Sequence, residues 1–399
     1  MSANANIRLP VYLDNQATTP VDPRVFAAMR PYFQEKFGNP HSTTHAVGTE
    51  AAAAVETARA QIATLIGAEA REIVFTSGAT EANNLAIKGA AAFEDEMRQR
   101  HRDRIVTLAS EHKCVLESCR RLERQGFRVA FLPVEPSGLV DLDRLRAALD
   151  DTTLLVSAMA ANNEIGTLQP LAEIGALCRA RGILFHSDCA QAVGKVAIDV
   201  EALTLDLASL SGHKLYGPKG IGVLYVRRRP RARLLPLFDG GGQERGLRSG
   251  TLPTPLCVGF GAACAIAGPE MADEAARLGR LRDRLRDGIM ARLPGVHLNG
   301  APEPRLPGNL NLSFDGIDAA GFMARAADLA VSSGSACTSA SVEPSYVLRA
   351  LGIDDARAAA SIRFGVGRFT TDAEIDYAIE AVAGHVAHLR ASGDRRAAR

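Results

Sequence analysis

Short apolar segments alternate with helix-length segments between about residues 70 and 230. Ile, Val, Leu and Ala fill the apolar segments with little polar alternation, which is typical of strands buried on both faces. Such strands, separated by helices, favour a mostly parallel sheet with helices on both sides. We therefore expect an α/β fold with a seven-stranded sheet. The predicted strands cover residues 72–77, 104–110, 127–134, 153–160, 182–188, 206–211 and 221–227, and helices are expected at 80–93, 111–125, 141–149 and 171–181.

The pattern changes after about residue 265. Long helical patterns rich in Arg, Ala and Leu, at 270–292 and 372–390, flank short predicted strands at 309–314 and 361–366. With 399 residues, the chain is longer than one hydrophobic core usually serves. We expect a large domain over residues 17–265 and a smaller α+β domain formed by residues 1–16 and 266–399.

Charge and cysteine content argue against several functional classes. The 46 basic and 45 acidic residues leave a net charge of +1, which gives no general attraction for nucleic acid or an anionic membrane. The sequence contains no signal-like stretch in residues 1–10 and no run of about 18 apolar residues. Its seven cysteines show no CxxC pair or zinc-ligand spacing, so we expect neither a disulfide framework nor a metal site. Reduced thiols fit a cytoplasmic protein best.

Lys214 and Asp188 each follow an apolar segment. Lys214 ends the sequence Ser-Gly-His-Lys just after one predicted strand, and Asp188 ends another. Ligands of parallel sheets gather beyond the carboxyl ends of the strands, so the two side chains can converge. A lysine that forms a Schiff base and a carboxylate that keeps a pyridine nitrogen protonated are what pyridoxal 5′-phosphate (PLP) requires. Taken alone, a lysine after a strand is more often a solvated surface charge.

A candidate phosphate site follows the first predicted strand. Ser77, Gly78, Ala79 and Thr80 lead into a helix, whose free amides and dipole attract anions. The alternative is a simple helix N-cap. The nucleotide-binding pattern GxxxxGK[ST] is missing, and no GxGxxG follows a strand. A second segment rich in glycine and hydrogen-bond donors lies at residues 240–251.

Cys337 lies in a segment of ten residues, 332–341, that contains no large side chain. Such a segment can bury no core of its own, so we expect a mobile surface loop. An accessible thiol on such a loop is a candidate nucleophile, and an incidental cysteine is the alternative. Cys178 and Cys264 lie in helical patterns with apolar neighbours and are expected to be structural.

Three further basic features are candidates for binding. Arg363 lies in an otherwise apolar strand, where it needs an anion such as a substrate carboxylate or an internal salt-bridge partner. His112 begins a helix after a strand and could stack on a ring, move protons or simply cap the helix. The arginine-rich run 227–233 reads as a solvated face or, less often, as a docking patch for an acidic protein.

Taken together, these segments resemble the cysteine desulfurases (NifS/IscS-like), PLP enzymes of the class-V aminotransferase family with the aspartate-aminotransferase fold, PLP fold type I. The resemblance implies L-cysteine as substrate, L-alanine as product and sulfur left on Cys337 as a persulfide. Delivery would be to iron–sulfur cluster assembly or to other sulfur acceptors. The likeness covers nearly the whole chain, in segments 12–20, 37–40, 76–81, 111–112, 162–166, 211–214 and 248–251 and the Cys337 loop.

The resemblance also implies a role for each site residue. Lys214 would hold PLP covalently, and Asp188 would pair with its pyridine nitrogen. Asn163 and Gln191 would hydrogen-bond near the ring oxygen O3′, while His112 would stack on the ring, and either His112 or Lys214 would move the Cα proton. The remaining contacts would be Ala79, Thr80, Ser211 and His213 to the phosphate, Thr251 from the second subunit of an obligate homodimer, and Arg363 with Asn163 to the substrate carboxylate.

Two features depart from the family pattern. Cys189 lies beside Asp188, where many relatives have a small residue, and we expect it to pack in the core. The chain ends without the longer extension by which some relatives dock the cluster scaffold, which leaves that docking open. A transaminase or selenocysteine lyase on the same fold is the near alternative. Cys337 distinguishes them, because a transaminase needs no thiol. A non-catalytic scaffold or sulfur carrier is the distant alternative. Lys214 argues against it, because a protein without catalysis needs no lysine to hold PLP.

Overall fold

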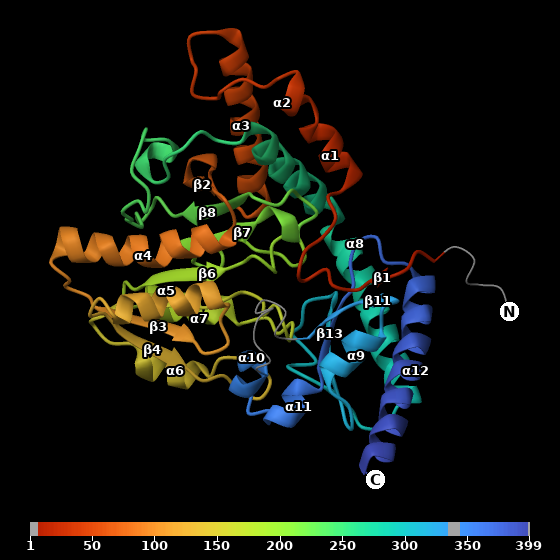
Figure 1. The fold of residues 1–399 in the computed structure, drawn as a ribbon. Coiled ribbons are helices and arrows are strands. Elements are labelled where there is room, and N and C mark those ends of the chain that lie inside the picture. The colour runs from red at the N-terminus through yellow and green to blue at the C-terminus, as the bar shows by residue number, and fades with distance from the viewer. Residues whose placement is uncertain (1–6, 334–343, 398–399) are drawn as a thin grey trace.

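The computed structural model describes residues 7–333 and 344–397. Figure 1 shows a large sheet surrounded by helices and, beside it, a smaller group of elements that includes α9 (Ala319–Arg325) and α12 (Asp372–Ala397). The helix α8 (Thr254–Arg292) runs from the first group into the second. Cys337, expected on a mobile loop, lies outside the described residues.

Seven strands form the large sheet in the order β2–β8–β7–β6–β5–β3–β4. β8 is antiparallel to both neighbours, and the other neighbouring pairs are parallel. The expected α/β fold with a mostly parallel sheet is therefore confirmed, and each strand is slightly shorter than predicted. The strands are β2 (Ile73–Thr76), β3 (Arg104–Leu108), β4 (Arg128–Leu132), β5 (Thr153–Ser157), β6 (Leu184–Asp188), β7 (Leu207–Ser211) and β8 (Gly222–Val226).

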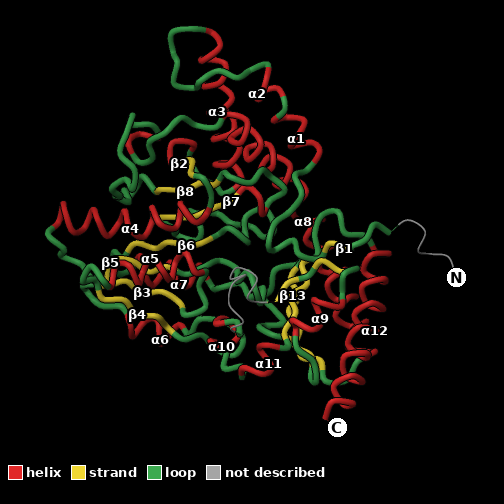
Figure 2. Tube along the Cα trace, viewed as in Figure 1, coloured by secondary structure: helices red, strands yellow, loops and turns green. Residues whose placement is uncertain are grey.

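Helices cover both faces of this sheet (Figure 2). In β2, Val74 belongs to the core cluster under α4 (Ala79–Arg98) and α5 (Lys113–Glu123). Ile73 and Phe75 point to the other face and belong to the cluster with the second layer. Successive strand residues thus enter opposite cores, which is why these strands are largely apolar. The second layer contains α1 (Pro23–Met29), α3 (Ala46–Leu65), α6 (Leu142–Ala148), α7 (Leu171–Arg179) and the first half of α8, and α2 (Pro31–Gln34) lies between α1 and α3.

A second, antiparallel sheet has the order β12–β13–β10–β9. Its apolar side chains form a separate core with α9, α12 and the second half of α8. Residues of α10 (Tyr346–Ala350) and α11 (Asp355–Ala359) instead pack in the core between the large sheet and its second layer of helices, which is called the first core below. The domain division at residue 265 remains our proposal. The strands of this region are β9 (Val296–Leu298), β10 (Asn309–Phe314), β12 (Ser332–Ser333) and β13 (Ser361–Gly365), and β1 (Val11–Tyr12) pairs in parallel with β11 (Leu329–Ala330).

The helix expected at 270–292 begins sixteen residues earlier, at Thr254, so Pro269 lies inside it rather than before it. Proline removes one helical hydrogen bond, but here packing on both sides of the proline stabilises the helix. Phe260 and Cys264 enter the first core, and Leu281 and Leu285 enter the second. By length and composition α8 could also cross a membrane. Its burial between two cores accounts for its apolar character equally well.

Candidate functional site

One cavity of about 500 Å³ lies at the carboxyl ends of the strands of the large sheet. Ser77 follows β2, Asp188 ends β6 and Ser211 ends β7, and all three line the cavity. This is where open α/β sheets bind their ligands. Ten residues proposed from the sequence line it: Ala79, Thr80, His112, Asn163, Asp188, Gln191, Ser211, His213, Lys214 and Arg363.

Lys214 ends a short 3-10 turn, Gly212–Lys214, directly after β7. Its Nζ donates hydrogen bonds to the main-chain carbonyl of Gln16 and, at 2.7 Å, to that of Ala17. The N-terminal segment therefore forms one wall of the cavity and holds the amine there. The structure thus supplies an amine at the cavity wall, as a covalent carbonyl cofactor requires.

Asp188 is buried, with 5% of its surface exposed. Its Oδ2 accepts a hydrogen bond from Asn83 Nδ2 at 2.7 Å, and its Oδ1 accepts one from the backbone of Ala190 at 2.9 Å. Among the described residues, no Lys, Arg or His forms an ion pair with it. A buried carboxylate normally has a cationic partner. The protonated pyridine nitrogen of PLP would supply one.

The first turn of α4 faces the same cavity through Gly78, Ala79 and Thr80. Within the described chain no side chain caps this turn, so its amides and the helix dipole favour an anion. β8 lies very close to it, because a Cβ on Gly222 would meet Gly78 Cα at 2.5 Å. Only glycine at position 222 permits this approach.

His213 lines the same cavity, with Nδ1 at 3.0 Å from Thr18 Oγ1. Burial, followed by the charges of Lys214, Lys219 and Lys195, lowers the pKa of His213 to about 4. The ring is therefore neutral near pH 7 and can present one N–H donor. A neutral donor, a serine hydroxyl and an uncapped helix terminus form a donor set that fits the phosphate of PLP.

His112 is the N-cap of α5, and its Nδ1 accepts a hydrogen bond from the backbone of Cys114. The capping alternative is therefore correct for this atom, but the ring also lines the cavity. Cys114 lies in the cavity as well, with its Sγ 3.0 Å from His112 Nδ1 and 3.1 Å from Asn83 Nδ2. Sequence reasoning missed Cys114 and Asn83. Cys114 could have been indicated by its position two residues after His112, whereas Asn83 carries no local signal and acts through Asp188, 105 positions away.

Arg363 projects from β13 and is 2% exposed. Nη2 donates to Asp14 at 2.8 Å and Nη1 to the carbonyl of Asn163 at 2.9 Å. Its buried Nε has no hydrogen-bond partner in the part of the chain that the structure describes. The internal salt bridge is thus present, yet one donor beside the cavity is unused. Arg363 also lines the cavity, where a guanidinium suits a carboxylate.

One proposed site residue does not line this cavity. Thr251 is exposed and does not line the cavity of its own chain. Cys337 lies outside the described residues. The other thiols, apart from Cys114, are buried. Burial raises the pKa of Cys189 to about 12, and this side chain belongs to the first core, which confirms the expectation that it packs there.

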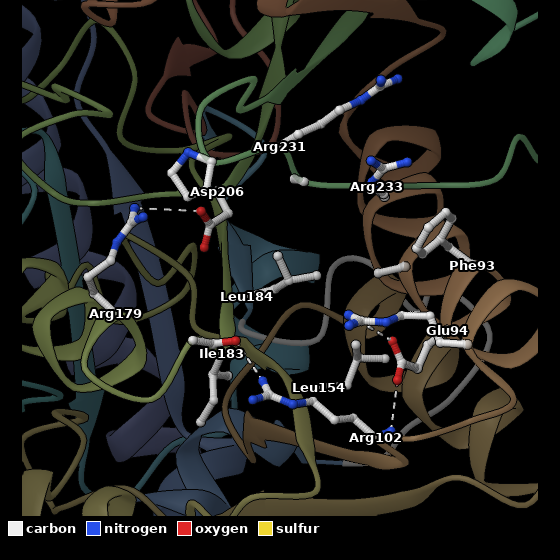
Figure 3. A pocket seen from close by; sticks show the side chains of 15 residues that line it. Phe93, Glu94, Arg102, Leu154, Arg179, Ile183, Leu184, Asp206, Arg231 and Arg233 are labelled. Atoms are coloured by element: carbon white, nitrogen blue, oxygen red, sulfur yellow. Dashed lines mark hydrogen bonds and ion pairs between the residues drawn. The ribbon is translucent and has the colours of Figure 1, made fainter.

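A second cavity, of about 520 Å³, lies at the amino ends of β5, β6 and β7 (Figure 3). Arg231 and Arg233, from the arginine-rich run, line it and are exposed. Arg227 is different, since only 3% of it is exposed and it pairs with Glu201 at 3.0 Å. The prediction that the whole run 227–233 is a surface patch is therefore wrong at its first residue. That arginine directly follows β8 and pairs with the carboxylates of Glu201 and Asp206.

The chain is similar to known proteins along almost its whole length. The family described as aminotransferase class-V matches residues 11–378. The cysteine desulfurase IscS of Rickettsia akari (strain Hartford) is 58% identical over 385 residues, covering 96% of this chain and 93% of that protein. The corresponding enzyme of Rickettsia bellii (strain OSU 85-389) is also 58% identical over 385 residues, with the same coverage.

Solved structures agree with this. A NifS-like protein has a TM-score of 0.88 at 36% identity, covering 96% of this chain and 100% of the other. SspA in complex with cysteine has a TM-score of 0.79 at 38% identity, covering 90% and 99%. The expected PLP fold type I is thus confirmed. The chain belongs to the class-V aminotransferase family and, within it, to the cysteine desulfurases.

Proposed function

We propose that this protein is a PLP-dependent cysteine desulfurase that converts L-cysteine to L-alanine and takes the sulfur onto Cys337. The observation that carries the proposal is the wall of one 500 Å³ cavity. It combines an amine at Lys214, a buried carboxylate at Asp188 without a cationic partner among the described residues, and the guanidinium of Arg363. The family membership and the cysteine complex of SspA support the same substrate.

PLP, when bound, supplies an aldehyde that joins covalently to amines and a ring that takes up electrons. Lys214 would hold its aldehyde carbon, and Asp188 would keep the ring nitrogen protonated. Asn163 and Gln191 would lie against O3′, and His112 against the ring face. The phosphate would be bound by Ala79, Thr80, Ser211 and His213.

Arg363 would bind the carboxylate of cysteine, together with Asn163. This fixes the amino acid so that its Cα–H faces the bases of the cavity. Lys214 Nζ or the His112 ring would then move the Cα proton. Because Asp14 also holds the guanidinium at 2.8 Å, Arg363 would be oriented before the substrate arrives.

The Cys337 thiolate would then attack the sulfur of the bound cysteine. The C–S bond of the substrate breaks, an S–S bond forms on Cys337, and the electron pair stays with the carbon that takes a proton and becomes the alanine methyl. A free thiol near pKa 8.5 is only a few per cent ionised at pH 7, so the site must deprotonate it.

Mass spectrometry of the intact protein tests this directly. After incubation with L-cysteine we expect one added sulfur that maps to Cys337, with release of alanine. Cys337→Ala should lose both, and Cys189→Ala, at a buried packing position, is the matched control. Alanine release by Cys337→Ala at the rate of the unmodified protein would overturn the proposal and favour a lyase.

The finer biological setting is also part of the proposal. Relatives at 58% identity are named IscS, which supports a cytoplasmic role in supplying sulfur to iron–sulfur assembly. An acidic acceptor or scaffold protein would dock on the exposed Arg228, Arg229, Arg231 and Arg233. Reversing Arg228 and Arg231 to Glu should then weaken binding of that partner and leave the turnover of free cysteine unchanged.

A further inference from the structure

We propose that Lys195 is a positioning residue that fixes which end of the Gln191 side-chain amide faces the PLP site. The proposal rests on the proposed function and deepens it. Lys195 follows the loop after β6 and lines a small cavity beside Gln16, Tyr216 and Glu274. It is not part of the PLP cavity itself, and sequence reasoning did not single it out.

Two contacts define the orientation of the Gln191 amide. Lys195 Nζ donates to Gln191 Oε1 at 3.1 Å, and Gln191 Nε2 donates to the main-chain carbonyl of Gln16 at 2.8 Å. The same carbonyl of Gln16 accepts from Lys214 Nζ. Gln191 Nε2 therefore lies on the Lys214 side, and Oε1 lies on the side of Lys195.

Both contacts select the same orientation. Below its pKa Lys195 is an ammonium group, which can only donate hydrogen bonds, and a carbonyl can only accept them. A reversed amide would set its NH₂ group against the lysine and its oxygen against the Gln16 carbonyl. The amide nitrogen has a second N–H, so Gln191 presents a donor on the side of the cofactor. A donor there stabilises a negative O3′ and lowers its basicity.

A packing role for Lys195 is disfavoured by its charge environment. The charges that act on it are those of Lys214, Glu274 and Arg363, and no carboxylate lies within ion-pair distance among the described residues. Part of its side chain remains accessible, yet the ammonium is surrounded by protein. Desolvation first, then Lys214, lowers the pKa of Lys195 to about 7. A methionine would fill the same space without this cost.

The holoenzyme tests the proposal through the absorption spectrum of the bound cofactor and its affinity. In Lys195→Met we expect the pKa of the cofactor chromophore to rise by about one unit and the PLP dissociation constant to rise about tenfold. Lys195→Gln keeps an N–H donor and should retain most of both properties, and it serves if Lys195→Met fails to fold. Lys88→Met, at a partly exposed lysine of α4, should change neither.

A double-mutant cycle with Gln191→Ala decides between positioning and a direct effect of charge. If Lys195 acts through Gln191, Lys195→Met has no further effect once Gln191 is Ala. Equal shifts in both backgrounds, or no shift in the single variant, would overturn the proposal. Failure of the proposed function is distinct: unmodified protein would then bind no PLP at Lys214 at all.

Discussion

Glu164 shows how a single residue beside the site ties stability to pH. It lies in the 162–166 turn after β5 and is 4% exposed, and its Oε2 accepts a hydrogen bond from Ser345 at 2.5 Å. Desolvation raises the pKa of Glu164 to about 7, although Ser345, Arg363 and His112 act in the opposite direction. The turn itself requires Gly166, where φ is +74° and a Cβ would meet Asn309 Oδ1 at 2.4 Å.

The raised pKa predicts a loss of stability as the pH rises. Between about pH 4.5 and 7 the folded protein keeps a proton that the unfolded chain releases, so the free energy of unfolding falls with pH through this window. The total is about 3 kcal/mol. Glu164→Gln should remove this fall and be more stable than the unmodified protein at pH 8, as measured by denaturant unfolding of the cofactor-free protein. Glu117→Gln, at an exposed position, is the control, and a parallel pH profile for both variants would contradict the prediction.

At the residue scale, site residues can be predicted from the sequence when a short motif next to a strand marks them. Lys214, Asp188 and the start of α4 follow strands, and the structure brings them to one cavity; their roles remain proposals. Asn83 and Lys195 could not be found this way. Asn83 contacts Asp188, 105 positions away, and Lys195 contacts Gln191, four positions away. Both contacted residues line the cavity only once the chain is folded, so no local pattern indicates these roles.

At the scale of elements, α8 packs against α3 more closely than side chains usually allow. A Cβ on Gly261 would lie 2.5 Å from Ala58 Cα and 2.7 Å from Ala58 Cβ. On the same helix, nothing lies within 4 Å of a Cβ built on Gly279. The two glycines therefore differ in packing although both lie in a helix interior.

We expect Gly261→Ala and Gly279→Ala to change stability in opposite directions. Alanine favours a helix by about 1 kcal/mol over glycine, so Gly279→Ala should raise the free energy of unfolding by up to that amount. At Gly261 the overlap with Ala58 outweighs this gain, and a net loss of about 1–3 kcal/mol is expected. Thermal or denaturant unfolding measures both. Equal stabilisation by the two substitutions would show that α3 and α8 can separate at no cost.

Elements were predictable where their own residues decide them. The seven strands of the large sheet are rich in apolar residues and were all predicted. The two-residue strands β1, β11 and β12 were not, because their pairing depends on the partner strand rather than on propensity. The start of α8 was also missed because it depends on contacts distant in sequence: two separate cores stabilise the helix on either side of Pro269.

At the scale of the whole molecule, the site proposed for PLP is incomplete in one chain if Thr251 belongs to it. Arg248 holds this loop on its own chain through Glu81 at 2.9 Å, and the backbone of Gly250 donates to Gln243 at 2.8 Å. Thr251 nevertheless stays exposed. Large apolar side chains are exposed on α1, α2, the segment after α2 and the start of α3: Phe26, Phe33, Phe37 and Val47. Exposed apolar groups of this kind support a homodimer.

Complementation between two inactive variants tests whether Thr251 acts across the dimer. In Lys214→Ala the covalent anchor is missing, and in Thr251→Glu a carboxylate would repel the phosphate. Their heterodimer contains one site with an intact Lys214 and, if Thr251 crosses, an intact threonine from the other chain. We expect about one PLP trapped by reduction per heterodimer, mapped by mass to Lys214 of the Thr251→Glu chain, and none in either parent. If Thr251 serves its own chain, the heterodimer traps none, because each site then carries one defect.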